Sequence, residues 1–63
     1  MDAYIGDRKL QKGDVVKDFR GFEWIYYRVS QDWSPGKSGK VLVGDENRPQ
    51  REFYPSVFDA EIR

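Results

Sequence analysis

The chain has 63 residues, with eleven basic and eleven acidic side chains and therefore no net charge. It contains neither cysteine nor histidine, which excludes disulfides, thiolate zinc sites, cysteine nucleophiles and histidine-based catalytic triads. The balanced charge argues against a dedicated nucleic-acid-binding domain, because such domains of this size are normally basic. A chain of this length forms one small domain, and we expect it to carry no cofactor.

The chain contains no candidate membrane segment. No stretch approaches the roughly 20 apolar residues of a membrane-spanning helix. Residues 1–7 lack the basic and apolar regions of a signal peptide. We therefore expect no membrane partner and a cytoplasmic location.

Two strands joined by a tight turn are expected in the first half of the chain. Asp14–Phe19 alternates with the two-residue period of a strand. Asp18 and Gly21 suit the hairpin turn that follows. Phe22–Val29 is the strongest strand, since nearly all of its residues are aromatic or β-branched. Residues 1–11 are expected to form an N-terminal arm or an edge strand.

The second half of the chain is expected to form short strands and turns without a helix. A loop rich in Ser, Pro and Gly covers Gln31–Gly39, and strands follow at Lys40–Val43 and Arg51–Tyr54. Pro55–Phe58 has proline at its first position and predicts a single 3₁₀ turn. Ala60–Arg63 is the last short strand.

Five short strands separated by turn residues predict an all-β fold. We expect residues 12–63 to form a small five-stranded antiparallel barrel, with the 3₁₀ turn before the last strand. Closure into a barrel is favoured because it removes the unpaired strand edges that a protein of this size cannot otherwise cover.

Two stretches resemble barrels of the Src-homology-3 (SH3-like) type. They are KGDVV followed by EWIYYRV, and FYPSVFDAEI near the end, where Pro55, Ser56 and Phe58 match a Pro-Ser-x-aromatic 3₁₀ turn. The register of the five strands is closer to KOW-type or Tudor-type barrels. The chain also resembles small proteins of actinobacteria and their phages in its GDVV-DFRG-EW opening (13–24) and its REFYPSVF close (51–58). This resemblance implies an SH3-like fold and a phage-encoded or phage-derived origin.

The aromatic strand is expected to carry the recognition surface. A period of two places Phe22, Trp24 and Tyr26 on one face of this strand. We expect the opposite face to supply the core, made of Ile25, Tyr27, Val29, Val16, Leu42 or Val41, Tyr54 and Ile62. A barrel strand needs only one buried face, so the three rings are predicted to form an exposed platform. Alternatively, they cover the open end of the barrel or pack against the N-terminal arm through Tyr4, Ile5 and Leu10.

The loop at 31–39 adds a second aromatic candidate. Trp33 lies among small polar residues, where it is either an interface anchor or a ring folded back over the barrel. Lys37 lies in the same loop, and Arg28 lies on the aromatic strand. The predicted partner-binding residues are Phe22, Trp24, Tyr26, Arg28, Trp33 and Lys37.

No catalytic or metal site is expected. The Gly36-Lys37-Ser38 fragment is not a phosphate loop, because position 31 is glutamine where that motif requires glycine. Nine of the eleven carboxylates lie beside turns, basic residues or strand edges, which suits solvated surface positions; they are Asp14, Asp18, Glu23, Asp32, Asp45, Glu46, Glu52, Asp59 and Glu61.

These observations favour a non-enzymatic protein-binding module that docks a host or phage protein through its aromatic face. One alternative is a KOW-like module for single-stranded nucleic acid, with Arg20, Arg28, Lys37 and Lys40 gathered around Trp24 and Tyr26. Another is a homodimer in which the Phe22–Val29 strand pairs across a two-fold axis and no external ligand is needed.

Overall fold

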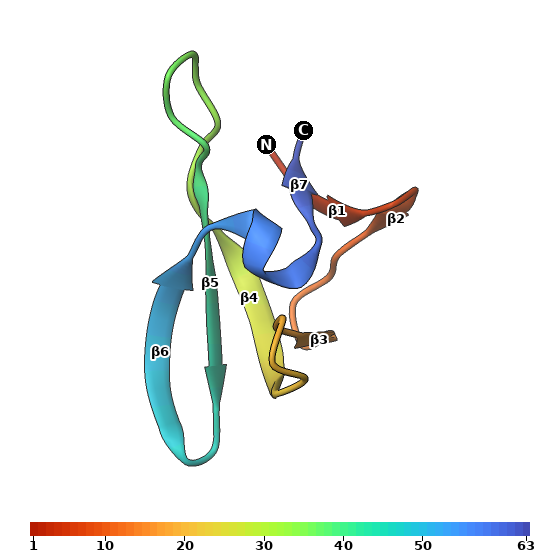
Figure 1. The fold of residues 1–63 in the computed structure, drawn as a ribbon, viewed down its shortest axis with the longest axis vertical. Coiled ribbons are helices and arrows are strands. Elements are labelled where there is room, and N and C mark those ends of the chain that lie inside the picture. The colour runs from red at the N-terminus through yellow and green to blue at the C-terminus, as the bar shows by residue number, and fades with distance from the viewer.

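A computed structural model of residues 1–63 consists of β-strands and one 3₁₀ turn, without α-helix (Figure 1). The all-β prediction is confirmed. Four strands form one antiparallel sheet in the order β3 (Val15–Lys17), β4 (Glu23–Gln31), β5 (Lys40–Asp45) and β6 (Arg48–Phe53). No helix is long and apolar enough to cross a membrane.

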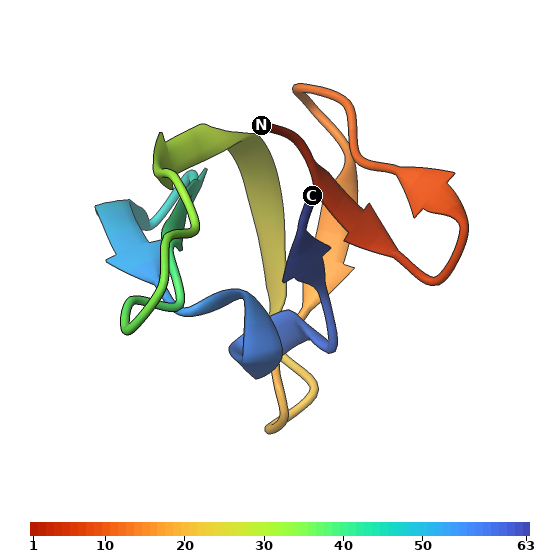
Figure 2. The same ribbon diagram turned by 90° about the horizontal axis from the view of Figure 1, so that it is seen from above.

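The second sheet joins the two ends of the chain. Its order is β2 (Arg8–Lys9), β1 (Ala3–Ile5) and β7 (Glu61–Ile62). Beside this sheet, Asp2 and Arg63 exchange two backbone hydrogen bonds of 2.9 and 2.8 Å, which hold the termini together (Figure 2). Residues 1–11 therefore contribute paired strands.

The predicted closed barrel is not formed, because the two sheets remain separate. The last strand pairs with β1, near the N-terminus, where closure of a five-stranded barrel would pair it with β3. The strand β7 has only two residues, and its pairing with β1 gives their backbone N–H and C=O groups hydrogen-bond partners. The 3₁₀ turn η1 (Pro55–Phe58) has the predicted bounds and links the two sheets along the chain.

The turn between β3 and β4 is organised by the carboxylate of Asp18. Its Oδ1 accepts hydrogen bonds from the backbone N–H groups of Arg20 (2.9 Å) and Phe22 (3.0 Å). Its Oδ2 accepts one from the indole Nε1–H of Trp24 (3.1 Å) and lies 3.6 Å from the Arg20 guanidinium. The prediction of a solvated surface position is wrong for Asp18, which is 7% exposed. A buried carboxylate is stable here because each of its oxygens has donors.

The electrostatics of Asp18 reflect two opposing effects. Burial alone raises the pKa of this carboxyl. The hydrogen bonds from Trp24, Phe22 and Arg20, together with the charge of Arg20, outweigh burial and lower its pKa below the ordinary value of 3.8. The folded chain therefore favours the ionised form of Asp18.

A β-bulge interrupts the alternation of β4 side chains between the two faces of the sheet. Tyr26 pairs with Val43 and Arg28 pairs with Leu42, so Tyr27 is an extra residue in β4. Before this bulge, Trp24 and Tyr26 point inward; after it, Val29 packs against the core. The strict two-residue alternation expected from the sequence therefore does not run through the strand.

The core differs from the predicted one in several positions. Its eight buried members are Ala3, Leu10, Val16, Trp24, Tyr26, Val41, Val43 and Phe58. Val16 and Val41 were expected there, whereas Ile25, Tyr27 and Leu42 are only partly buried and Tyr54 is 56% exposed. Tyr27 lies on the other face of the sheet, against Gly44, where no side chain obstructs its ring.

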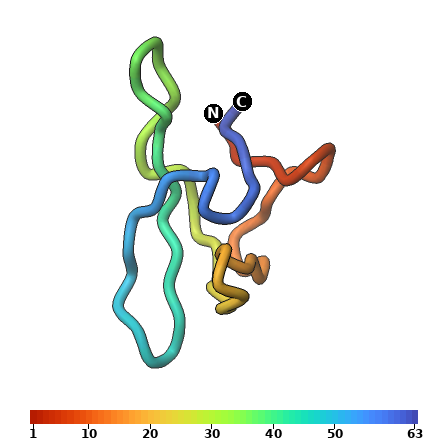
Figure 3. Tube along the Cα trace, viewed as in Figure 1, coloured from red at the N-terminus to blue at the C-terminus, as the bar shows by residue number.

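The loop between β4 and β5 projects from the end of the molecule opposite the β3–β4 and β5–β6 turns (Figure 3). Its tip is a turn in which Ser34 and Lys37 exchange backbone hydrogen bonds of 2.8 and 3.2 Å. Pro35 and Gly36 (φ 84°) occupy the central positions, as in a type II turn. At its base, Gly39 (φ 75°) packs so closely that an added Cβ would lie 2.8 Å from the carbonyl oxygen of Gln31.

Replacing Asp18 with asparagine tests the turn. Asp18→Asn keeps one carbonyl acceptor but places an amide donor against the indole N–H of Trp24, so we expect the midpoint of thermal unfolding to fall by at least about 5 °C. Because the pKa of Asp18 is lowered in the fold, its contribution is present above the unfolded-state pKa and is lost as pH falls through the folded-state pKa. Circular dichroism melts between about pH 7 and pH 2 should show a smaller acid-induced loss for the variant. Equal midpoints at neutral pH would contradict this role.

Gly39→Ala and Gly36→Ala form a matched pair that tests the loop base. Both glycines have positive φ, which alone costs an alanine about 1–2 kcal/mol. At Gly36 an added Cβ meets no atom within 4 Å, whereas at Gly39 it also collides with the backbone of Gln31. We expect Gly39→Ala to lower the free energy of unfolding more than Gly36→Ala in urea titrations. Equal losses would show that the loop base is not tightly packed.

Candidate functional site

The structure separates the six predicted partner-binding residues. Trp24 and Tyr26 are buried, with 2% and 4% of their surface exposed. Phe22 and Trp33 are half-exposed, and Arg28 and Lys37 are exposed. The expectation that Trp24 and Tyr26 belong to an exposed platform is therefore wrong. Of the three rings, Tyr26 lies against the N-terminal segment, as the alternative expected.

Trp24 is enclosed by groups from several elements. The Phe53 ring meets it edge-on, with centroids 5.2 Å apart. The Arg48 guanidinium lies 3.8 Å from the indole centroid, within range of a cation–π contact. Arg48 itself is held by the Asp45 carboxylate (Nε to Oδ2, 2.8 Å) and by the carbonyl oxygen of Glu23 (3.0 Å).

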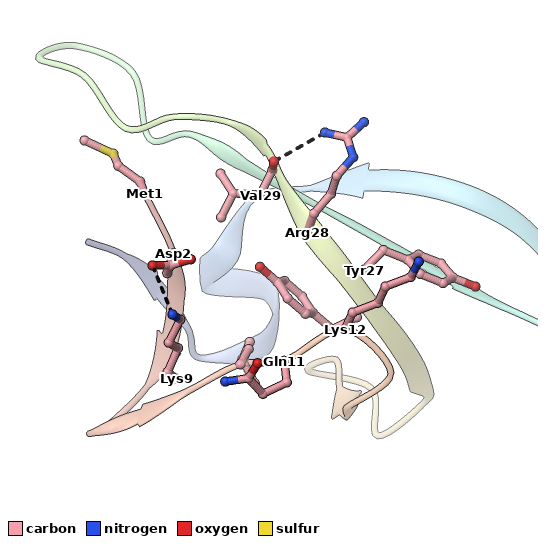
Figure 4. A pocket seen from close by; sticks show the side chains of 10 residues that line it. Met1, Asp2, Lys9, Gln11, Lys12, Tyr27, Arg28 and Val29 are labelled. Atoms are coloured by element: carbon pink, nitrogen blue, oxygen red, sulfur yellow. Dashed lines mark hydrogen bonds and ion pairs between the residues drawn. The ribbon is translucent and has the colours of Figure 1, made fainter.

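Tyr26 lies beneath the N-terminal segment, on the floor of a hollow of about 300 Å³. Figure 4 shows this hollow between the Met1–Asp2 backbone and β4, with Lys9 turned toward Asp2 (3.5 Å) and Arg28 turned toward the carbonyl of Val29. Burial, followed by the charge of Asp2, raises the pKa of the Tyr26 phenol. The hydroxyl of Tyr26 makes no hydrogen bond within the chain, so this ring contributes to packing alone.

An exposed aromatic pair occupies the β3–β4 turn. Phe19 is 80% exposed and Phe22 is 50% exposed. The Arg20 guanidinium lies 5.6 and 5.1 Å from their ring centroids, and Arg48 lies 5.6 Å from that of Phe22. Both arginines are already ion-paired, with Asp18 and Asp45, so this turn presents apolar surface whose nearby charges are compensated.

A second exposed aromatic pair lies at the opposite end and is here termed the loop-end surface, made of Trp33, Lys37, Lys40 and Tyr54. Trp33 is 50% exposed and Tyr54 is 56% exposed. The Lys40 ammonium lies 5.6 Å from the Tyr54 ring centroid. The four residues come from the β4–β5 loop, the start of β5 and the residue that precedes η1.

Two adjoining hollows connect these four side chains. Trp33 lines one of them, together with Pro55 and Ile62. The other, of about 480 Å³, is lined by Gln31, Gly36, Lys37, Ser38, Gly39, Lys40, Tyr54 and Ser56. Ser38 and Ser56 line both hollows, so the loop-end surface is continuous.

The sequence predicted Trp33 and Lys37 as partner-binding residues and named Lys40 only for the nucleic-acid alternative, and it missed Tyr54. The sequence predicts a strand at Arg51–Tyr54 and a core position for Tyr54. In the structure β6 ends at Phe53, and Tyr54 has the extended backbone that precedes Pro55. Pro55 has no backbone N–H to continue the ladder of a strand, and this is the signal that could have shown the strand end.

The charges of the surface are unevenly compensated. Five basic side chains form ion pairs with carboxylates: Arg8, Lys9, Arg20, Arg48 and Arg63. The other six basic side chains form none, and two of these six, Lys37 and Lys40, belong to the loop-end surface. No group of three or more carboxylates is arranged to hold a metal ion.

Comparisons of this chain with protein-family models, with curated proteins and with solved structures gave no match.

Alanine substitution tests whether Tyr26 is a core side chain or part of an exposed binding surface. We expect Tyr26→Ala to lower the free energy of unfolding by about 3–5 kcal/mol, because it leaves a cavity beneath the N-terminal segment. Tyr26→Phe keeps the ring and removes only the hydroxyl, so it should cost less than about 1 kcal/mol. Urea titration of both variants gives the values. A Tyr26→Ala variant as stable as the wild type would contradict the burial of this ring and would favour the exposed platform expected from the sequence.

Proposed function

We propose that the protein is a non-enzymatic module that binds another protein through its loop-end surface. The observation that carries this proposal is a pair of half-exposed rings, Trp33 and Tyr54, beside two lysines without ion-pair partners. Large aromatic side chains are the commonest energetic anchors of protein interfaces. Of the partner-binding residues expected from the sequence, Trp33 and Lys37 belong to this surface.

The SH3-like relationship is part of the same proposal. The order of two hairpins, a 3₁₀ turn and a short last strand supports it. A phage-encoded or phage-derived origin and a cytoplasmic location rest on the sequence resemblance and on the composition of the chain.

A nucleic-acid interface of the expected kind has weaker support. It required Trp24 and Tyr26 as stacking rings, and both are buried. Single-strand binding depends on a positively charged groove that follows the phosphate backbone. At the loop end the exposed rings are accompanied by only two free lysines, Lys37 and Lys40, in a chain with no net charge.

A dimer formed by pairing of β4 also has weaker support. This strand lies between β3 and β5, and β3 already occupies its outer edge along Glu23–Ile25. The outer strand β6 carries Pro49, Arg51 and Glu52, which hinder edge-to-edge pairing.

Selection from a displayed random-peptide library tests the proposal, and the chain offers a matched control. Peptides selected on the wild type should bind a Trp33→Ala, Tyr54→Ala variant at least about tenfold more weakly, because both anchors are gone. The control is Phe19→Ala, Phe22→Ala, which removes the exposed pair at the opposite end and should leave binding unchanged. Loss of binding in the control alone, or in neither variant, would contradict the proposal. Sedimentation of the same samples should show a monomer, and a dimer would favour the homodimer instead.

A further inference from the structure

The larger hollow of the loop-end surface has an unusual charge balance. Its lining contains Lys37 and Lys40 and no carboxylate. Each of the other hollows of the molecule includes at least one carboxylate, such as Asp2, Asp45 or Glu61. In a chain with as many acidic as basic side chains, this is the one hollow that lysines line without any carboxylate. The hollow above Tyr26 also contains unpaired basic groups, Lys12 and Arg28, but the carboxylate of Asp2 lies among them.

The same hollow contains hydrogen-bond donors that the chain does not use. The hydroxyls of Ser38 and Ser56 and the side-chain amide of Gln31 line it, and none of them bonds to another group of the protein. Two ammonium groups and several neutral donors around one space form a typical environment for an oxyanion.

The backbone of Gln31, Ser38 and Lys40 within this lining is fixed by the sheet and by the tight packing of Gly39. Lys40 is the first residue of β5 and pairs with Gln31 at the end of β4. Gly39, between Ser38 and Lys40, is wedged against Gln31 and against the Ile62 side chain. A lining that is ordered in advance loses less conformational entropy on binding.

We propose that this hollow binds a phosphate monoester group, carried on a phosphorylated side chain of the partner protein. The inference rests on the proposed function and specifies the chemistry that the loop-end surface recognises. A phosphate monoester carries a charge of about −1.5 to −2 at pH 7, which matches two ammonium groups, whereas a carboxylate or a nucleic-acid phosphodiester carries one negative charge. The exposed Tyr54 ring, next to Lys40, offers an apolar face for the group that carries the phosphate.

Small aromatic esters test the site without knowledge of the partner. Phenyl phosphate is the probe, and phenyl sulfate is its singly charged analogue of the same shape. In ¹H–¹⁵N NMR titrations near neutral pH, phenyl phosphate should shift the amide signals of residues 36–40, Tyr54 and Ser56. Its affinity should exceed that of phenyl sulfate by at least about fivefold, because the second charge meets a second lysine.

Paired lysine variants supply the control. Lys37→Gln, Lys40→Gln should weaken phenyl phosphate at least about tenfold, whereas Lys12→Gln, Lys17→Gln removes two other unpaired lysines and should have no effect. Ser38→Ala, Ser56→Ala should weaken binding while leaving every charge in place. The spectrum of each variant without ligand shows whether its fold is retained.

Several results would overturn the inference. These are no shift at millimolar phenyl phosphate, shifts spread over all lysines, or equal affinity for phenyl sulfate. Tighter binding of a short oligo(dT), with an affinity that falls steeply as salt is raised, would assign the hollow to nucleic acid. If phenyl phosphate fails while selected peptides still require Trp33 and Tyr54, the docking surface stands and only its phosphate specificity is wrong.

Discussion

The hydrogen bond from the Trp24 indole to the Asp18 carboxylate fixes which face of β4 becomes the interior. Asp18 also accepts two backbone N–H groups of the turn, so one carboxylate positions both the hairpin turn and the largest ring of the core. The Arg48 guanidinium then closes over the indole from the neighbouring hairpin. If Trp24 faced outward, Asp18 would lose a donor and the space against Val16 and Phe53 would be empty, and each change would destabilise the fold.

This inward arrangement determines where recognition can occur. With Trp24 and Tyr26 buried, the centre of the four-stranded sheet offers no aromatic platform. The exposed rings lie at the two ends of the molecule, at the β3–β4 turn and at the loop-end surface. Their charge environments differ, because the arginines beside Phe19 and Phe22 are paired with carboxylates whereas Lys37 and Lys40 are free. The loop end therefore combines anchor rings with two unpaired lysines around a hollow that no carboxylate lines, and this makes it the better candidate for binding an anionic partner.

Much of the local structure could be predicted from the sequence. The tight turn at 18–21, the aromatic strand and the 3₁₀ turn at Pro55–Phe58 depend on nearby residues whose conformational preferences are strong. The inward face of β4 could not be predicted from its alternation, because Trp24 and Tyr26 alternate with Ile25 and Tyr27 and both sets are apolar. The bulge that brings Val29 to the same side as Trp24 and Tyr26 depends on the register against β5 and is equally invisible in the sequence. The pairing of β1 with β7 was also beyond local rules, since strands of two and three residues carry almost no periodic signal. The contact between Tyr54 and Lys40 is likewise long-range, and it joins segments that only the folded sheet brings together.

Hydrogen exchange of the two indole N–H groups measures the central claim most directly, because the chain has one tryptophan inside and one at the surface. Transferred into deuterated buffer, the Trp24 signal should persist at least about a hundredfold longer than the Trp33 signal, since the Trp24 N–H is buried and bonded to Asp18. The Trp33 indole should exchange rapidly. Two signals that disappear equally fast would show that Trp24 faces solvent, and both the core and the location of the binding surface described here would then be wrong.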